Sequence, residues 1–331
     1  MNENNIKTGN KFLNRAKELL TSTAGMVLIV TIVMTVIVHF ATGGNFYTAY
    51  NLATYTRTAS FTILVGCAQT LVLLLGGIDL SVASMASLCS MVFAMLVLMA
   101  GVNPFVAILA AAVTGVLCGA INGAFICGLN LPPFIVTLAT SSLFSGIVYV
   151  ATQGFPLTGI PESVTVIGQG SLFGAIPYPT LIMIAAAIIL MIMLKYTSFG
   201  RHIYAVGGNE NAAKIVGIRT NRTKVGVYTL AGLISGLTGV LMVLRMGASQ
   251  VNIGEDWVMP SITAAVLGGT SMSGGSGGVG GTLIGGLLMS AITFCINLIG
   301  LSSYWNNVVT GAVVLVAVSI DAITKKRQEA A

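Results

Sequence analysis

The basic residues of this chain are confined to short polar stretches that are separated by long apolar runs. Thirteen of the fifteen Lys and Arg residues fall into three islands, at the N-terminus, in the middle and at the C-terminus. They are Lys7, Lys11, Arg15 and Lys17; Lys195, Arg201, Lys214, Arg219, Arg222 and Lys224; and Lys325, Lys326 and Arg327. Cytoplasmic segments of multi-pass membrane proteins carry such an excess of positive charge. The pattern therefore predicts a helical protein that crosses a membrane several times.

The composition agrees with a lipid environment. Charged residues make up 7% of the 331 residues, whereas soluble domains carry roughly 25%. Hydrophobic residues make up 55%, and the mean hydropathy is +0.94. A soluble core could not hide this much apolar surface, so membrane lipids are the expected surroundings. The net charge of +6 belongs to loops at the membrane surface and does not indicate nucleic acid.

Ten segments are apolar and approach the roughly 20 residues that a membrane-spanning helix needs. They predict an all-α polytopic fold with about ten transmembrane helices, in a single domain over residues 1–331. The segments are 24–40, 58–76, 80–100, 105–126, 134–152, 178–196, 225–244, 258–270, 280–299 and 305–321.

An even number of spans agrees with all three basic islands. Both termini and the loop 197–224 then face the cytoplasm, and the loops 153–177 and 246–257 face outward. Residues 1–22 form a polar cytoplasmic segment. Within it, the stretch KFLNRAKELL has one apolar helical face and predicts a short interfacial helix.

Small residues recur at the spacing of helix contacts. Gly115, Gly119 and Gly123 form one ladder. The pairs Gly232/Gly236 and Gly281/Gly285 repeat the GxxxG spacing. Such glycines let helix backbones approach one another closely in lipid, so these positions predict tight helix crossings.

Two apolar runs end in the same LGGxxxS pattern, at residues 75–81 and 267–273. Apolar segments interrupted by glycine point to a transport pathway. Asp79, in the first of them, is the only acidic residue near the middle of the apolar region. Its carboxylate can cap the third span through the N–H of Ser81 or Val82, or it can serve as a proton or substrate site.

Further polar side chains lie inside the spans. Thr137, Ser141 and Ser145 form one stripe at a spacing of four residues; this stripe lines a pathway or holds helices together. The candidate translocation-path and hinge residues are Gly76, Gly77, Asp79, Ser81, Asn122, Thr137, Ser141, Ser145, Gly268 and Gly269.

Several kinds of chemistry are excluded. No Gly-Lys dipeptide occurs, so the chain has no Walker A loop. The five cysteines lack the spacing of metal ligands and are interpreted as packing residues. A formal GxSxG match within 274–278 follows no strand, and the two histidines, His39 and His202, lie on opposite predicted sides of the membrane. We therefore expect no catalytic residue, no metal and no cofactor on this chain.

Five motifs, in this order and spacing, resemble the permease subunits of bacterial ABC importers for monosaccharides, the ribose-permease family. They are LGGIDLSVASM (75–85), LPPFIVTLAT (131–140), TSFGRHIYAVGGNENAAKIVGI (197–218), AAVLGGTSMSGG (264–275) and LIGLSSYWNNVVTGAVVLVAV (298–318). The resemblance covers nearly the whole chain. One departure is Ala83, where the family usually has a glycine.

The resemblance implies a type II ABC importer permease in the bacterial inner membrane, which forms the path for a ribose-like pentose or a related sugar. It implies a second copy or a homologue, two cytoplasmic ATPase subunits that hold ATP and magnesium, and a periplasmic sugar-binding protein. It also implies that residues 197–224 contain the coupling helix that the ATPase grips. The coupling residues would be Gly208, Asn209, Glu210, Ala213, Gly217 and Ile218.

The residues of this loop themselves predict a short rigid helix. Asn209 can cap its start, Glu210 lies in the first turn, and Lys214 follows one turn later. Gly217 can close its end.

Arg57 and Arg245 are the two basic residues outside the islands, on the outer side of the predicted topology. They are candidates for docking the acidic rim of a binding protein, or they extend their side chains to the membrane interface.

An ion-coupled secondary transporter is the alternative function. Such proteins carry acidic or histidine side chains within the membrane, and Asp79 is the single candidate here. A membrane-embedded enzyme is the third possibility, for which the sequence offers no nucleophile–base pair and no metal-ligand set.

Overall fold

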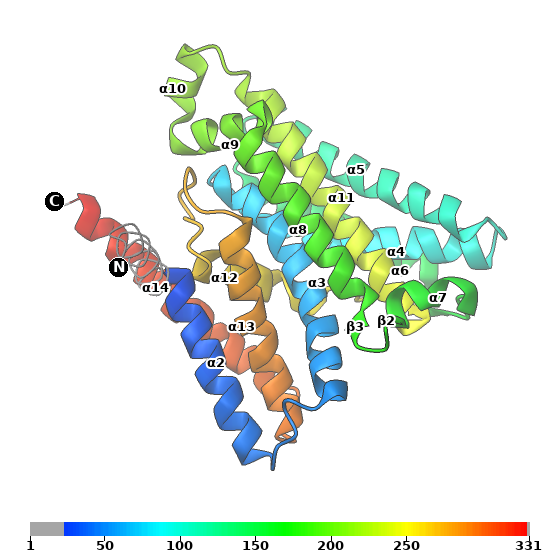
Figure 1. Cartoon of the computed structure of the whole chain (residues 1–331). Coiled ribbons are helices and arrows are strands. Elements are labelled where there is room, and N and C mark those ends of the chain that lie inside the picture. Colours follow the sequence, from blue (N-terminus) through cyan, green and yellow to red (C-terminus); the bar gives the residue numbers. More distant parts are fainter. Residues whose placement is uncertain (1–22, 330–331) are drawn as a thin grey trace, which may run out of the picture.

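The computed structural model describes residues 23–329, most of which are helical (Figure 1). The predicted interfacial helix within residues 1–22 lies outside the described residues. The helices are α2 (Thr23–Ala41), α3 (Ala49–Leu74), α4 (Val82–Leu98), α5 (Pro104–Gly128), α6 (Pro133–Thr152), α7 (Glu162–Gln169), α8 (Tyr178–Tyr196), α9 (Ser198–Gly208), α10 (Glu210–Ile215), α11 (Thr220–Met246), α12 (Val258–Leu267), α13 (Val279–Leu298) and α14 (Trp305–Glu329), with a 3₁₀ turn at Glu255–Trp257.

Each of the ten apolar segments predicted from the sequence coincides with a helix, namely α2 to α6, α8 and α11 to α14. Among the described residues, seven helices are long and apolar enough to cross a membrane. The helix α4 and the apolar part of α14 are shorter, and α12 has only 10 residues. The polytopic helical fold is therefore confirmed, whereas the helix lengths do not establish the number of crossings as ten.

Local sequence explains where several helices begin. Asn103 caps α5 by accepting the N–H of Phe105 at 2.9 Å, and Pro104 occupies the first helical position, where its missing N–H costs nothing. Thr48 caps α3 by accepting the N–H of Asn51 at 3.3 Å. The helix α3 thus starts nine residues before the apolar run that predicts it, because its first turns are polar.

The loop 153–177, predicted without regular structure, contains the helix α7 and parts of two short ribbons. Strand β1 (Leu157–Thr158) pairs antiparallel with β4 (Ala248–Ser249). Strands β2 (Ser171–Leu172) and β3 (Ile176–Pro177) form a hairpin. The β1–β4 pair joins the two loops that the sequence places on the same side of the membrane.

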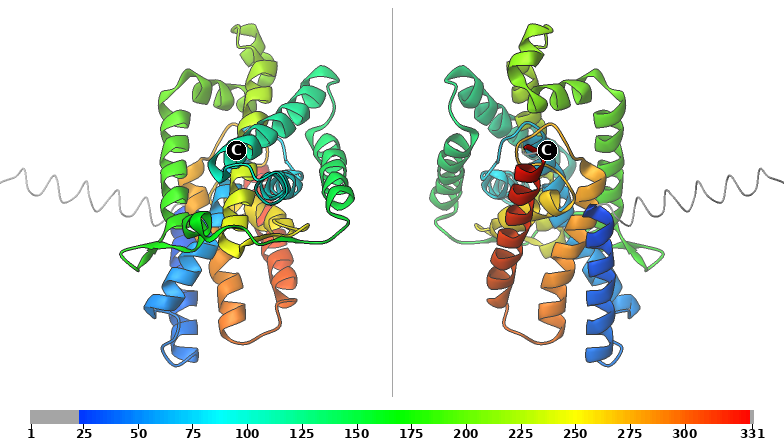
Figure 2. Two further views of the ribbon diagram at one scale, coloured as in Figure 1. Left: turned by 90° about the vertical axis from the view of Figure 1, so that its right-hand side faces the viewer. Right: turned by 90° about the vertical axis from the view of Figure 1, so that its left-hand side faces the viewer.

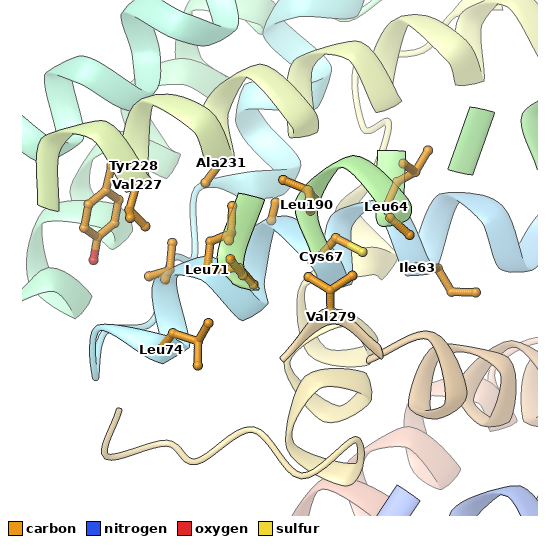
Figure 3. Close-up of a cluster of buried hydrophobic side chains, with 14 of the residues drawn as sticks. Ile63, Leu64, Cys67, Leu71, Leu74, Leu190, Val227, Tyr228, Ala231 and Val279 are labelled. Atoms are coloured by element: carbon orange, nitrogen blue, oxygen red, sulfur yellow. The ribbon is translucent and has the colours of Figure 1, made fainter. Parts of the chain in front are cut away.

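The central helix of the bundle is α3, whose residues from Ala59 to Leu74 are all buried by its neighbours (Figures 1 and 2). Leu64, Cys67 and Leu71 of α3 pack against Leu190 of α8 and Ala231 of α11 (Figure 3). All five cysteines are free, and Cys67 lies inside this core, which agrees with the packing role inferred for them.

The predicted glycine ladders lie at helix crossings. A β-carbon on Gly119 of α5 would overlap the carbonyl oxygen of Tyr228 in α11, and one on Gly232 would overlap that of Gly115. In the same way, a β-carbon on Gly285 of α13 would overlap the carbonyl oxygen of Ala264 in α12, and one on Gly281 would overlap that of Gly268, which directly follows α12. These helices touch backbone to backbone, so the ladders set the spacing of the bundle.

The substitution Gly119→Val is expected to destabilise the protein by at least about 2 kcal/mol, because neither backbone at the crossing can yield to the added side chain. The matched control is Gly146→Val on α6, where an added β-carbon meets no atom within 4 Å. Thermal unfolding and size-exclusion profiles in detergent measure both variants. Equal stability of the two would contradict the crossing described here.

Candidate functional site

Glycines end both interrupted helices in the same hydrogen-bond arrangement, the Schellman motif. At the end of α3, Gly76 has a φ of +77°, and the N–H of Gly77 donates to the carbonyl of Val72 at 3.2 Å. At the end of α12, Gly269 has a φ of +88°, and the N–H of Thr270 donates to Ala265 at 2.9 Å. The left-handed glycine is the first of the LGG pair in one repeat and the second in the other. The two breaks thus share a geometry but are shifted by one residue.

Three separate segments meet at a point that we call the glycine junction, made of Gly76, Gly207, Gly274 and Gly275. A β-carbon on Gly207, near the end of α9, would overlap the carbonyl oxygen of Leu74 and lie 2.8 Å from the nitrogen of Gly275. The N–H of Gly275 donates to the same Leu74 carbonyl at 2.9 Å.

The junction joins the end of α3, the end of α9 and the loop between α12 and α13, at the end of the bundle from which α10 projects (Figure 1). Nearby, the hydroxyl of Tyr204 in α9 donates to the carbonyl of Gly277 at 2.9 Å. The base of α10 is therefore attached directly to both interrupted segments.

A buried polar cluster surrounds the first break. One carboxylate oxygen of Asp79, Oδ1, accepts the backbone N–H of Ser81 at 2.8 Å and its hydroxyl at 2.6 Å. The Nδ2 of Asn122 in α5 donates to the Ser81 hydroxyl at 2.7 Å. The Thr137 hydroxyl of α6 lies 3.3 Å from the carbonyl of Ile78. Asp79 accepts the N–H of Ser81, one of the two predicted contacts, but the N-cap residue of α4 is Ser81 itself, and no side chain caps that helix.

The backbone of Asp79 is held from the opposite side. In the orientation that satisfies both groups, the side-chain amide of Gln69 in α3 donates to the Asp79 carbonyl and accepts its N–H, both at 3.1 Å. The Gln69 side chain thus pairs with both backbone groups of Asp79, as the backbone of a neighbouring strand would. The cluster fastens the loop between α3 and α4 to three different helices.

Three buried polar atoms around this loop have no hydrogen-bond partner: Oδ2 of Asp79, Oδ1 of Asn122 and the hydroxyl of Tyr228. The Tyr228 hydroxyl adjoins Gly77, since a β-carbon there would lie 2.7 Å from it. Asp79 is fully buried, and neither ion pair found among the described residues involves it. A buried carboxylate without a cation is costly, and among the described residues only the two hydrogen bonds from Ser81 offset this cost. The sequence did not single out Tyr228, although a tyrosine within an apolar span requires a partner for its hydroxyl.

The other candidate path residues lie elsewhere. Ser141 and Ser145 are half-buried on α6, one and two turns beyond Thr137. Gly268 packs against the backbone of Gly281 at the start of α13. The structure thus brings five of the ten candidates into one cluster: Gly77, Asp79, Ser81, Asn122 and Thr137. Ser273, at the end of the second LGG segment, lies beside Gly76 at the glycine junction.

The predicted short helix in the loop 197–224 is present as α10, and its caps are as expected. The side chain of Asn209 accepts the N–H of Ala212 at 2.9 Å. At the other end Gly217 has a φ of +85°, and the N–H of Ile218 donates to the Ala213 carbonyl at 3.0 Å, which completes a Schellman motif. The preceding helix α9, which the sequence analysis missed, connects α10 to α8.

Glu210 ties α10 to the bundle. Its carboxylate contacts the ammonium of Lys224 in α11 at 2.6 Å and that of Lys214 at 3.0 Å. The hydrogen bond from Lys224 is the main cause that holds the pKa of Glu210 below its ordinary value. The contact with Lys224 fixes the orientation of a helix that has only 6 residues, whereas the contact with Lys214 lies within that helix.

The apolar side chains that α10 offers to a partner differ from those expected. Ala213 is 3% exposed and packs within the chain, so its side chain is not available for a contact. Ile215 and Val216 are 86% and 74% exposed, and the sequence analysis did not name them. These two adjacent aliphatic side chains are therefore the apolar part of α10 that is accessible from outside the chain.

The two basic residues outside the islands make contacts within the protein. Arg57 donates through Nη2 to the carbonyl of Gln169 at 2.8 Å. Arg245 donates to the Thr58 hydroxyl at 3.3 Å, and its guanidinium lies 5.4 Å from the ring centre of Phe61. Both side chains are half-buried and hold α7 and its neighbours together.

A polytopic bundle with two glycine-broken helices and a rigid projecting helix is the architecture of a membrane transport protein. The family model described as "Branched-chain amino acid transport system / permease component" matches residues 51–318. The chain belongs to this family of permeases.

Similar proteins include the ribose import permease protein RbsC of Bacillus subtilis, 40% identical over 84% of this chain and 86% of the relative. The fructose import permease protein FrcC of Rhizobium meliloti is 32% identical over 93% and 88%. The D-allose transport system permease protein AlsC of Escherichia coli is 35% identical over 85% and 86%. No solved structure matches the chain.

The substitution Asp79→Asn is expected to leave stability unchanged or to raise it. The amide keeps an acceptor for Ser81 and removes a buried charge that no cation balances. The matched variant Asp79→Ala leaves the Ser81 N–H without its acceptor and should cost roughly 1–3 kcal/mol. Thermal unfolding in detergent compares them. A loss for Asp79→Asn as large as that for Asp79→Ala would show that the carboxylate needs its charge.

Proposed function

We propose that this chain is the membrane-spanning permease subunit of an ATP-driven importer and forms the path for a monosaccharide. Membership of the permease family and the names of the ribose, fructose and allose import permeases support the proposal. The observation that carries it is α10, a capped helix whose base is attached to both glycine breaks.

In the proposed mechanism, a cytoplasmic ATPase subunit holds ATP and magnesium and grips α10. Ile215 and Val216 enter the contact, because they are the exposed aliphatic residues of this helix. Asn209, Glu210 and Gly217 keep α10 rigid through its caps and ion pairs. Gly208 and Ile218 flank it, and this chain itself contributes no catalytic residue.

Movement of α10 would reach the membrane through the glycine junction. Gly207 contacts Leu74 and Gly275 directly, with no side chain to absorb a displacement. The loop 75–81 continues from Leu74 into the cluster of Asp79, Ser81, Asn122 and Thr137. A push on α9 and α10 would therefore shift both broken helices together, which is what alternate opening of a path requires.

The proposed topology has ten crossings of the bacterial cytoplasmic membrane. Both termini and residues 197–224 face the cytoplasm, where most of the basic residues lie. The residues 153–177 and 246–257, joined by the pairing of β1 with β4, face outward. A periplasmic binding protein would deliver the sugar there, and a second permease copy or a homologue would complete the path.

Docking of the binding protein by Arg57 and Arg245 stays a prediction. Their internal contacts support a structural role for both, and the outward loops beside them would then form the docking surface.

The substitutions Ile215→Asp and Val216→Asp are expected to reduce co-purification of the ATPase subunit and to lower sugar uptake at least tenfold. A buried unpaired charge at an interface costs several kcal/mol. Asn211→Asp is the matched control, since it adds the same charge to an exposed polar position of α10. Uptake into cells, co-purification and size-exclusion profiles are measured together. Normal uptake by both aspartate variants would refute the role of α10.

The substitution Gly207→Ala is expected to separate assembly from transport. Its methyl group overlaps the Leu74 carbonyl, so α9 must move away from α3, whereas Ile215 and Val216 remain available. Uptake should fall strongly while the ATPase subunit still co-purifies. Gly208→Ala is the control, because an added β-carbon there meets no atom within 4 Å. Normal uptake by Gly207→Ala would show that the glycine junction does not transmit movement from α9 and α10 to the broken helices.

A further inference from the structure

A hollow of about 580 Å³ lies where α8, α9 and the start of α13 meet. Lys195 at the end of α8 and Arg201 in the first turns of α9 both line it. Its remaining walls combine polar backbone with apolar side chains: Met191, Leu194, Tyr204, Gly278, Val279 and Gly280.

The two cationic groups have no acidic partner among the described residues. The ion pairs found there both belong to Glu210, which binds Lys214 and Lys224. The ammonium of Lys195 lies over the ring of Tyr196, 5.2 Å from its centre, and no hydrogen bond of the Arg201 guanidinium is found. The hollow thus carries two positive charges without a counterion.

The backbone of the opposite wall adds to this preference for an anion. The helix α13 starts at Val279, and its first N–H groups have no acceptor within the helix. Gly278 and Gly280 have no side chains that could cover them. A β-carbon on Gly280 would still lie 3.8 Å from the sulfur of Met191, so there is room at this wall.

The apolar side of the hollow leads along a membrane helix. Ile184, Ile188 and Ile192 of α8 are exposed and follow one another at a spacing of four residues. Lys195 is three residues beyond Ile192 and continues the same face. A hydrocarbon chain that lies along these isoleucines would bring its polar end to Lys195 and Arg201.

We propose that this hollow binds the anionic headgroup of a phospholipid from the leaflet at the α8–α9 end of the protein. Basic pockets between membrane helices recognise such headgroups. The isoleucine stripe favours a lipid over a free phosphate, because a free phosphate has no hydrocarbon chain to contact these side chains. The proposal does not depend on the transported solute or on the ATPase.

The bound lipid would also steady the coupling region. Tyr204, which lines the hollow, donates to Gly277, and Gly277 follows the glycine junction by two residues. A headgroup held between Arg201 and the start of α13 would therefore fix α9 against the loop between α12 and α13.

Titration of the purified chain with phosphatidylglycerol, followed by native mass spectrometry, tests the proposal. Each basic group at an anionic surface contributes about a factor of five in affinity. The double variant Lys195→Gln/Arg201→Gln should therefore bind roughly thirtyfold more weakly. The matched control is Arg219→Gln/Arg222→Gln, which removes the same charge from the start of α11 and should bind within a factor of two of the unmodified chain. Equal losses in both pairs would overturn the proposal.

Two further variants separate the effect of the charge from the effect of the shape of the hollow. Arg201→Lys, which keeps the charge, should restore most of the binding that Arg201→Gln loses. Gly280→Leu keeps both charges but fills the hollow, and it should weaken binding at least fivefold. Undiminished binding by Gly280→Leu would mean that the lipid binds elsewhere.

The same assay distinguishes a bound phospholipid from a bound soluble anion. Phosphatidylcholine and soluble glycerol phosphate should not compete with phosphatidylglycerol at equal concentration. Competition by glycerol phosphate would refute the lipid in favour of a free anion. Loss of ATPase co-purification in the Lys195/Arg201 double variant, with unchanged phosphatidylglycerol binding, would instead make the hollow a protein contact.

Discussion

Direct contact between glycine backbones holds the helices of this protein at their distances from one another. In a bilayer the surroundings are as apolar as the side chains, so helices associate through close packing and hydrogen bonds. Gly115, Gly119 and Gly232 bring α5 and α11 into such contact, and Gly281 and Gly285 do the same for α13 and α12. The positions of the interrupted segments, and hence of any path between them, depend on these crossings.

The same kind of contact connects the membrane part to the projecting helix α10. At the glycine junction Gly207 approaches the carbonyl of Leu74 so closely that no side chain fits between them. A flexible side chain at this point would absorb small displacements by changing its rotamer. Backbone contact does not, because the peptide groups are rigid. The junction is therefore suited to transmit a movement between α9 and the ends of α3 and α12.

Hydrogen bonds satisfy the polar backbone groups that a broken helix exposes within a membrane. Unpaired backbone groups are costly in an apolar environment. Gln69 satisfies both backbone groups of Asp79, and Thr137 contacts the carbonyl of Ile78. Asp79 in turn holds the first N–H before α4. The polar residues inside the spans thus stabilise the break and at the same time leave three free polar atoms beside it.

Much of this architecture follows from the sequence alone. Hydropathy placed all ten apolar helices, because each carries its own signal along the chain, and Asn209 and Gly217 defined α10 because capping is local. The helices α7 and α9 were missed because they are short, at 8 and 11 residues, and lie in segments that are not continuously apolar. The first turns of α3 were missed for the same reason.

The tertiary structure decided which groups meet. The ladder at Gly115 and Gly119 indicates a close neighbour but not that the neighbour is α11, because glycine has no side chain that could select a partner. The sequence gives the residue types at Ala213, Ile215 and Val216, yet which of them is buried depends on how α10 rests on α11. The meeting of Gly76, Gly207 and Gly274, more than 60 residues apart in the chain, arises only when α3, α9 and α12 are packed.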